Sequence, residues 1–124
     1  MEEKNKTRRV GRSFIDAFNG LIFALKTEIN FQIEVVFAAA VIALMIIFQV
    51  TGTEVLILTM AIAVVLLAEL MNTAVERTMD IIQPENHPYV KTIKDLMAAS
   101  VLVVSLVALA VGLIIFIPYI YLYV

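Results

Sequence analysis

Residues 96–124 read LMAASVLVVSLVALAVGLIIFIPYIYLYV, which is 29 residues without a single charged side chain. Uncharged runs also cover 35–53, with 19 residues, and 55–68, with 14 residues. A helix needs about 20 mostly apolar residues to cross the hydrocarbon core of a bilayer. The run 55–68 reaches that length only if its helix continues through residues 69–72. The pattern predicts an all-α membrane protein with spanning helices over 33–52, 55–76 and 96–120 and a connecting loop over 77–94.

The overall composition supports the same fold class. The chain has 124 residues, of which 62% are hydrophobic and 16% charged, whereas soluble domains carry about 45–50% apolar and about 25% charged residues. A chain this short has too little interior to bury so much apolar surface. We therefore expect one membrane domain, 1–124, and exclude a soluble enzyme and a nucleic-acid binder. The absence of cysteine and the single histidine exclude thiolate and histidine-rich metal sites.

Positive charges are confined to two segments, one before the first span and one between the second and third. The first segment contains Lys4, Lys6, Arg8, Arg9, Arg12 and Lys26, and the second contains Arg77, Lys91 and Lys94. Positively charged residues favour the cytoplasmic side of a membrane. We therefore expect a multi-pass protein of the cytoplasmic (inner) membrane, with the N-terminus and residues 76–95 in the cytoplasm. Residues 51–54, Thr-Gly-Thr-Glu, would form a tight external turn, and the C-terminus would also be external.

Within the cytoplasmic segment 1–30, residues 13–27 have an amphipathic helical pattern. Phe14, Phe18 and Leu25 share one face of such a helix, whereas Asp16 and Lys26 lie on others. A helix of this kind can lie in the membrane interface with its apolar face toward the lipid. A soluble helix that packs against a partner is the alternative.

The polar residues at the end of the second span carry the strongest functional signal. At about 100° per residue, Glu69, Asn72, Glu76 and Asp80 fall within an arc of roughly 80° on one helix face. Like charges on one face repel, and a bound cation would relieve that repulsion. An ionisable residue inside a span is costly and is a functional candidate by default. The alternatives are that Glu69 and Asn72 form interhelical hydrogen bonds and that Glu76 and Asp80 form a solvated face.

Other notable residues have ordinary explanations. Glu34 can be an interfacial charge, Asp95 is favourable near a helix N-terminus, and His87 lies in a loop where solvent exposure is usual. The pairs Ala39-x-x-x-Ala43 and Ala108-x-x-x-Gly112 are typical of closely packed membrane helices. No glycine-rich phosphate loop, HExxH or GxSxG motif is present, so these residues alone do not identify a reaction.

Together, the motifs resemble those of the small bacterial integral-membrane diacylglycerol kinase and undecaprenol kinase family. The pattern Glu69-x-x-Asn72-Thr73-Ala74-x-Glu76-x-x-x-Asp80 is followed by Glu85-Asn86-His87-Pro88 and Lys94-Asp95. Residues 19–31 resemble the amphipathic helix and the start of the first span in this family, and residues 111–118 resemble its C-terminal end. The resemblance covers residues 12–118 in order and spacing.

The resemblance implies transfer of the γ-phosphoryl group of ATP to a membrane-lipid hydroxyl, with Mg²⁺, by a homotrimer whose subunits share active sites. Glu69 would be the general base and contact the lipid, and Asn72 would help to orient the reacting groups. Glu28 and Glu76 would bind Mg²⁺ and, through it, ATP. Residues that would line the nucleotide site are Glu85, Asn86, His87, Lys94 and Asp95, with weaker matches at Asp16 and at either Arg9 or Arg12.

Some positions depart from the family pattern. Gln32 stands where the family usually has Arg, Glu34 where many members have His, and Leu96-Met97 where small residues are common. These departures bear on the lipid, which is either diacylglycerol or undecaprenol.

Two other functions compete with a lipid kinase. A small cation-binding transport subunit would place acidic residues near the midplane of the membrane, whereas here they lie toward one surface. A non-catalytic membrane scaffold gives no reason for Glu69, Asn72 and Glu76 to align on one helix face.

Overall fold

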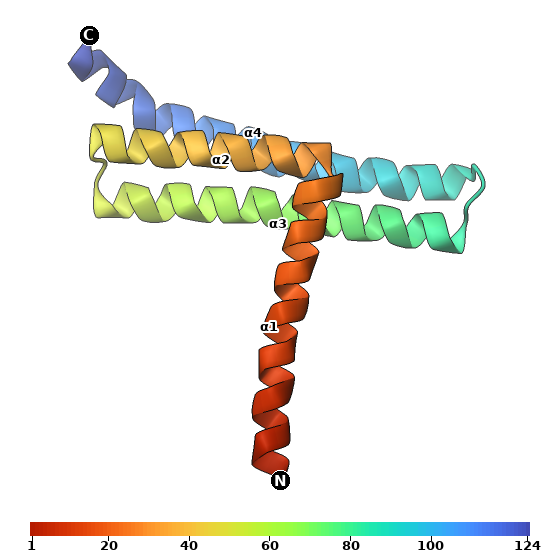
Figure 1. Cartoon of the computed structure of the whole chain (residues 1–124). Helices are drawn as coiled ribbons and strands as arrows, with labels where there is room; N and C mark the ends of the chain where they lie inside the picture. Colours follow the sequence, from red (N-terminus) through yellow and green to blue (C-terminus); the bar gives the residue numbers. More distant parts are fainter.

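The computed structural model describes all 124 residues and contains four helices. They are α1 (Glu2–Thr27), α2 (Ile29–Phe48), α3 (Gly52–Ile82) and α4 (Pro88–Tyr123). α2, α3 and α4 run alongside one another, and α1 leaves this bundle at a steep angle (Figure 1). α3 packs against both α2 and α4, most extensively against α4. α2, α3 and α4 are each long and apolar enough to cross a membrane, which confirms an all-helical fold with three candidate spans.

The break between α1 and α2 lies at Glu28. The backbone of Glu28 is extended, with φ −105° and ψ 106°, and its N–H still donates to the carbonyl oxygen of Ala24 at 2.9 Å. Gln32 Nε2 donates to the carbonyl oxygen of Leu25 at 2.8 Å and so links the two helices. Ala24 and Phe31 are buried on either side of the break. α1 is therefore held at its C-terminal end and points away from the bundle elsewhere (Figure 1).

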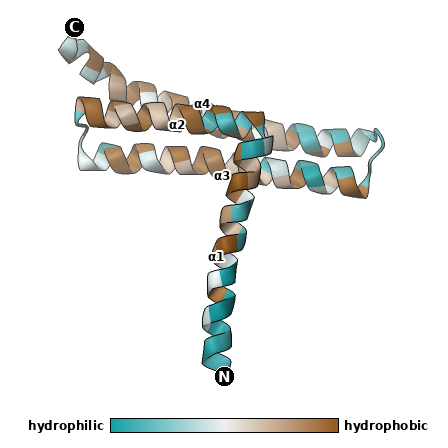
Figure 2. Cartoon of the chain, viewed as in Figure 1, coloured by the Kyte–Doolittle hydropathy of each residue, from teal (hydrophilic) through white to brown (hydrophobic).

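α1 begins at Glu2 and is longer than the amphipathic segment expected from residues 13–27. Its apolar side chains, including Phe14, Ile15 and Phe18, are exposed. Figure 2 shows a hydrophilic N-terminal half and apolar patches in the half nearer the bundle. Within this chain nothing covers those patches, and the interfacial role of α1 stays a prediction.

The turn between α2 and α3 lies at residues 49–51 and not at the expected 51–54. Gln49 adopts the left-handed conformation with φ 49° and closes α2. Thr51 caps α3 because its hydroxyl accepts from the Glu54 N–H at 3.3 Å, while Glu54 Oε2 accepts from the Thr51 N–H at 2.8 Å. This reciprocal capping box draws residues 52–54 into the first turn of α3.

The connection between α3 and α4 spans residues 83–87 and is shorter than the loop expected over 77–94. Pro88 lies in the first turn of α4, where its missing N–H costs no hydrogen bond, and His87 Nδ1 accepts from the Tyr89 N–H at 3.2 Å. The two helices are longer than the expected spans because polar sequence can stay helical in water when side chains support it. One such support is the i, i+4 pair between Lys91 and Asp95, at 2.6 Å.

A small core closes the end of the bundle near the α2–α3 turn. Met45, Val50, Leu58 and Phe116 are buried there. The ring of Phe48 lies over this core, with ring centroids 6.0 Å from Phe116, 5.8 Å from Tyr119 and 5.5 Å from Tyr123. α2 and α4 therefore meet through aromatic side chains at this end.

Most apolar side chains of the chain are exposed. Only 9 of the 124 residues are buried, although α2, α3 and α4 each contain a long apolar stretch (Figure 2). Soluble monomers rarely expose contiguous apolar surface of this extent. The chain is therefore a membrane protein, with lipid or other protein chains covering its helices.

Candidate active site

The buried polar side chains all lie on one face of α3. Exposed fractions are 3% for Glu69, 5% for Asn72 and 7% for Thr73, and no other polar residue of the chain is buried. Glu76, one turn further on, is half-buried. Because burial of an ionisable group in a span is costly, this stripe is the candidate functional site, at the position that the sequence pattern predicts.

Glu69 lies among hydrogen-bonding and acidic neighbours. Asn30, at the start of α2, and Asn72 are hydrogen-bonding neighbours of its carboxylate, and Glu28 and Glu76 lie close enough to repel it. The structure thus brings together four of the predicted site residues, Glu28, Glu69, Asn72 and Glu76, where α1, α2 and α3 meet. The like charges of these carboxylates repel one another, and a nearby cation would relieve that repulsion.

Asn72 has an unmet hydrogen-bonding group within this site. Its Oδ1 atom is buried and has no hydrogen-bond partner. An unpaired buried polar atom costs about 1–3 kcal/mol, and native structures leave few of them. A ligand or a second chain at this position would supply the missing partner.

Glu28 is held at the site by an ion pair with α3. The Nη2 atom of Arg77 donates to Glu28 Oε1 at 2.5 Å, and the Thr27 hydroxyl lies 3.2 Å from the same oxygen. The Arg77 guanidinium also lies 5.7 Å from the centre of the Phe23 ring, within cation–π range. The hydrogen bond from Arg77 lowers the pKa of Glu28 below its ordinary value of 4.5, so Glu28 is ionised at neutral pH.

The sequence pattern predicted no role at the site for Arg77, which counted only as a cytoplasmic positive charge, or for Asn30. Arg77 follows Glu76 directly, but its partner Glu28 lies 49 positions away, and no spacing rule connects the two. Asn30 is two residues after Glu28 at the start of α2. Its polar amide at the beginning of an apolar span is the one signal that could have pointed to it.

The carboxylates of the site suit a Mg²⁺ ion that phosphate oxygens and water also coordinate. They do not enclose a metal ion by themselves. No three carboxylate or imidazole groups of the chain converge as a ready metal site. Mg²⁺ is usually held by one or two carboxylates, with phosphate oxygens and water completing its six ligands. Glu28 and Glu76, both near Glu69, match that donor set.

Beyond Glu76, α3 and the start of α4 continue as a two-helix extension past the α1–α2 junction (Figure 1). There Lys94 Nζ lies 2.5 Å from Asp80 Oδ1. Asp80 lies one helical turn from Glu76, about 6 Å along the axis. Lys94 is thus held on the side of α4 that faces α3, next to the polar stripe, while the neighbouring Asp95 is paired with Lys91.

The other predicted nucleotide-site residues lie apart from Glu69 in this chain. Glu85, Asn86 and His87 are exposed at the tip of the α3–α4 extension, roughly 20 Å beyond Glu69 along α3. Asp16 and the alternatives Arg9 and Arg12 are exposed on α1, which points away from the bundle (Figure 1). These six residues reach the site of the same chain only if α1 or the tip moves.

Comparison with known proteins places the chain in a family. The model of the family described as prokaryotic diacylglycerol kinase matches residues 16–116. The undecaprenol kinase of Bacillus subtilis (strain 168) is 33% identical over 117 residues, which cover 94% of this chain and 95% of that protein. The diacylglycerol kinase of Synechocystis sp. (strain ATCC 27184 / PCC 6803 / Kazusa) is 32% identical over 101 residues, which cover 81% of this chain but 58% of that protein. Both relatives are lipid kinases by name, and the chain belongs to the prokaryotic diacylglycerol kinase family.

Proposed function

We propose that this protein transfers the γ-phosphoryl group of ATP to the hydroxyl of a membrane lipid. The observation that carries the proposal is the burial of Glu69 and Asn72 beside Glu28 and Glu76, at the end of an otherwise apolar span. Phosphoryl transfer needs positioned oxygen atoms and charge neutralisation more than covalent chemistry. The family and the named relatives support the same reaction class.

In this mechanism Glu69 is the general base. Its carboxylate accepts the proton of the lipid hydroxyl as the hydroxyl oxygen bonds to the γ-phosphorus of ATP. The bond between that phosphorus and the β–γ bridging oxygen breaks, and ADP leaves. The side-chain amides of Asn30 and Asn72 lie beside the Glu69 carboxylate, where donation from them would fix the basic oxygen relative to the reacting hydroxyl.

Glu28 and Glu76 would hold Mg²⁺, which, when bound, neutralises phosphate charge during the transfer. The Arg77 ion pair keeps Glu28 ionised and directs its carboxylate toward α3. Lys94, kept beside α3 by Asp80, is the neighbouring cation for the nucleotide phosphates.

We propose a homotrimer with shared active sites. A single chain buries 9 of its 124 residues and leaves Asn72 Oδ1 without a partner. Glu85, Asn86, His87, Asp95, Asp16 and Arg9 or Arg12 would complete the nucleotide site between subunits. With the bundle upright in the inner membrane, α1 would lie along the cytoplasmic surface, and the α3–α4 extension would project into the cytoplasm.

Undecaprenol is the first lipid to test. The relative named undecaprenol kinase matches over 95% of its length, whereas the relative named diacylglycerol kinase matches over 58%. Purified protein in detergent or bilayers would receive labelled ATP and Mg²⁺ with undecaprenol or diacylglycerol in parallel. We expect labelled undecaprenyl phosphate, and stronger labelling of diacylglycerol would reverse the assignment. If neither lipid is labelled, a transport or scaffold subunit becomes the better reading.

A further inference from the structure

The basic side chains of α1 have no acidic partners within the chain. Outside α1, each of the three basic residues, Arg77, Lys91 and Lys94, is in an ion pair. Those of α1, all exposed and none in an ion pair, are Lys4, Lys6, Arg8, Arg9, Arg12 and Lys26. α1 has 6 basic and 3 acidic side chains, a net charge of +3, whereas residues 28–124 have 3 basic and 8 acidic ones, a net charge of −5. The uncompensated positive charge is thus concentrated on the helix that leaves the bundle (Figure 1).

The two halves of α1 differ in what could hold them at a membrane. Residues 13–27 include the exposed apolar side chains of Phe14, Phe18 and Ile22, which suit the membrane interface. In residues 2–12 the only apolar side chain is that of Val10, and Figure 2 shows this half as hydrophilic. Burial of apolar surface therefore cannot account for a fixed position of the N-terminal half.

The basic residues of the N-terminal half lie on both flanks of the apolar face. At about 100° per residue, Lys6 and Arg8 fall roughly 100° to either side of the direction midway between Phe14 and Phe18. The basic residues of segment 4–12 extend over roughly 12 Å of the helix axis. Long basic side chains on the flanks of a helix reach headgroups while the helix lies flat on the membrane. Charges spread in this way match an extended anionic surface better than one compact anion.

We propose that residues 4–12 of α1 dock on the anionic phospholipid headgroups of the membrane surface, with charge as the main attraction. The steep angle between α1 and the bundle brings α1 along that surface when the bundle is upright (Figure 1). Each Lys or Arg near an anionic leaflet favours the docked state by about fivefold. The match to the family model begins at residue 16, so this basic segment precedes the part of the chain that the family model covers.

Two other anionic partners compete with the lipid surface. One is the phosphate of a nucleotide, for which Arg9 or Arg12 is already a candidate contact. A single nucleotide cannot extend to Lys6 on one flank and Arg8 on the other. The second is an acidic face of another subunit, and its hold on α1 would not depend on the lipid composition of the membrane. The test therefore varies the lipid and the nucleotide separately.

A single fluorescent residue can report the position of each half, because the chain has no tryptophan. Val10→Trp places the probe in the basic half, and Phe18→Trp is the matched control in the apolar half. Both native side chains are exposed, at 57% and 63%. The full-length protein is reconstituted without nucleotide into phosphatidylcholine vesicles with or without phosphatidylglycerol, and phospholipids with brominated acyl chains serve as the quencher.

We expect Val10→Trp to be quenched strongly only when phosphatidylglycerol is present. The quenching should disappear at about 1 M salt, where the Debye length is about 3 Å. Phe18→Trp should be quenched in both kinds of vesicle and at both salt concentrations. Combined Lys4→Gln, Lys6→Gln and Arg8→Gln should lower the ratio of docked to free N-terminal halves by about 100-fold. The charge-conserving set Lys4→Arg, Lys6→Arg and Arg8→Lys should behave as the parent Val10→Trp protein.

Three results would overturn the proposal. Equal quenching of Val10→Trp with and without phosphatidylglycerol would show that lipid charge does not hold this half. Unchanged quenching after removal of the three charges would exclude these side chains. A change in Val10→Trp emission that requires added ATP, with no response to phosphatidylglycerol, would assign the segment to the nucleotide. Because quenching needs no turnover, the result holds whether or not the protein phosphorylates a lipid alcohol.

Discussion

Arg77 and Glu28 lie 49 positions apart in the chain, yet their side chains meet at 2.5 Å and join α3 to the break between α1 and α2. The pair places one cation within a group of carboxylates that includes Glu69 and Glu76. Without Arg77, Glu28 would face these acids with no compensating charge. The ion pair is therefore a positioning contact for Glu28 as well as a link between helices.

The first prediction is that Arg77→Gln weakens the use of Mg²⁺–ATP more than it lowers kcat, because Glu28 loses the contact that directs it. The Mg²⁺ concentration for half-maximal activity should rise, and Arg77→Lys should retain part of the effect of the cation. Arg8→Gln, on the exposed N-terminal part of α1, is the control. An unchanged Mg²⁺ requirement in Arg77→Gln would leave Arg77 with a structural role alone.

The same pair predicts a dependence of stability on pH. The folded pKa of Glu28 is lowered below 4.5 by Arg77, so the pair stabilises the fold above that pH and the stabilisation is lost as pH falls through the lowered pKa. In detergent, Arg77→Gln should therefore unfold at a lower temperature than wild type at pH 7, and the difference should shrink below pH 4.5. A difference that stays constant down to pH 3 would contradict this origin.

A second contact fixes the opposite end of the bundle. The Tyr119 hydroxyl donates to Glu54 Oε2 at 2.6 Å and ties α4 to the capping box of α3. We predict that Tyr119→Phe lowers the melting temperature in detergent, because α4 loses its hydrogen bond to the start of α3, with little effect on turnover. Tyr121→Phe is the matched control because Tyr121 is fully exposed. Equal melting temperatures for the two variants would show that the Tyr119 contact contributes nothing.

The topology is also testable. Since all Lys and Arg residues lie in two segments, we predict that the α3–α4 connection is cytoplasmic and that the C-terminus is external. Reporter fusions at Asn86 and after Val124 read the two locations. A cytoplasmic signal from the C-terminal fusion would reverse the orientation of the bundle.

Comparison of the sequence with the structure shows which features depend on local patterns. The polar stripe of Glu69, Asn72 and Glu76 follows from helical periodicity and could be predicted in full. The Thr51–Glu54 capping box is also visible in the sequence as Thr-x-x-Glu, and because it begins α3 at Gly52, the turn lies two residues before the expected 51–54. The partners Arg77 and Glu28 could not be predicted, because their meeting depends on the angle at which α1 and α2 join.

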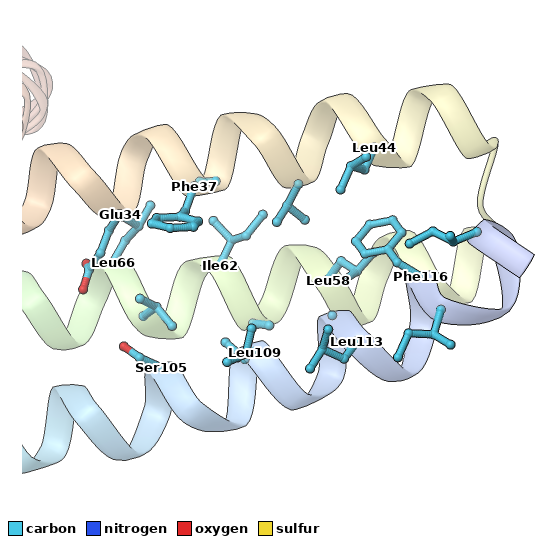
Figure 3. Close-up of a pocket in the computed structure, with 18 residues that line it drawn as sticks. Glu34, Phe37, Leu44, Leu58, Ile62, Leu66, Ser105, Leu109, Leu113 and Phe116 are labelled. Carbon is cyan, nitrogen blue, oxygen red and sulfur yellow. The ribbon is translucent and has the colours of Figure 1, made fainter.

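The apolar groove between α2 and α4, over α3 (Figure 3), was equally hidden in the sequence. Ala108 and Gly112 carry the small-residue spacing of a helix-packing face, yet in the structure both line the groove between α2 and α4. Small residues permit close approach of a neighbour but do not specify whether it is a helix or a lipid chain. Only the arrangement of α2 and α4 around α3 leaves that side open.

Glu76 is predicted to act through the metal. Glu76→Gln keeps the size of the side chain but removes the charge that would hold Mg²⁺, so activity should fall sharply while folding and oligomeric state are unchanged. Nucleotide binding that depends on Mg²⁺, measured by calorimetry, should weaken in parallel. Glu3→Gln, on the exposed start of α1, removes a carboxylate far from Glu69 that has no role in the proposed site, and should leave the Mg²⁺ requirement close to that of wild type. A Glu76→Gln variant with normal Mg²⁺ dependence would remove Glu76 from the metal site.

Glu69 is predicted to act on the lipid hydroxyl and not on the nucleotide. Glu69→Gln retains the size and hydrogen bonding of the side chain but has no basic oxygen, so the loss should fall on kcat, by about 10²–10⁴-fold, with nucleotide affinity little changed. Glu69→Asp should rescue poorly, because a shorter side chain withdraws the oxygen from the buried position beside Asn72. If Glu69 were only an interhelical hydrogen-bonding residue, Gln would replace it well. Measurement of kcat and nucleotide affinity in bilayers separates the two roles, and near-normal turnover in Glu69→Gln would end the general-base assignment.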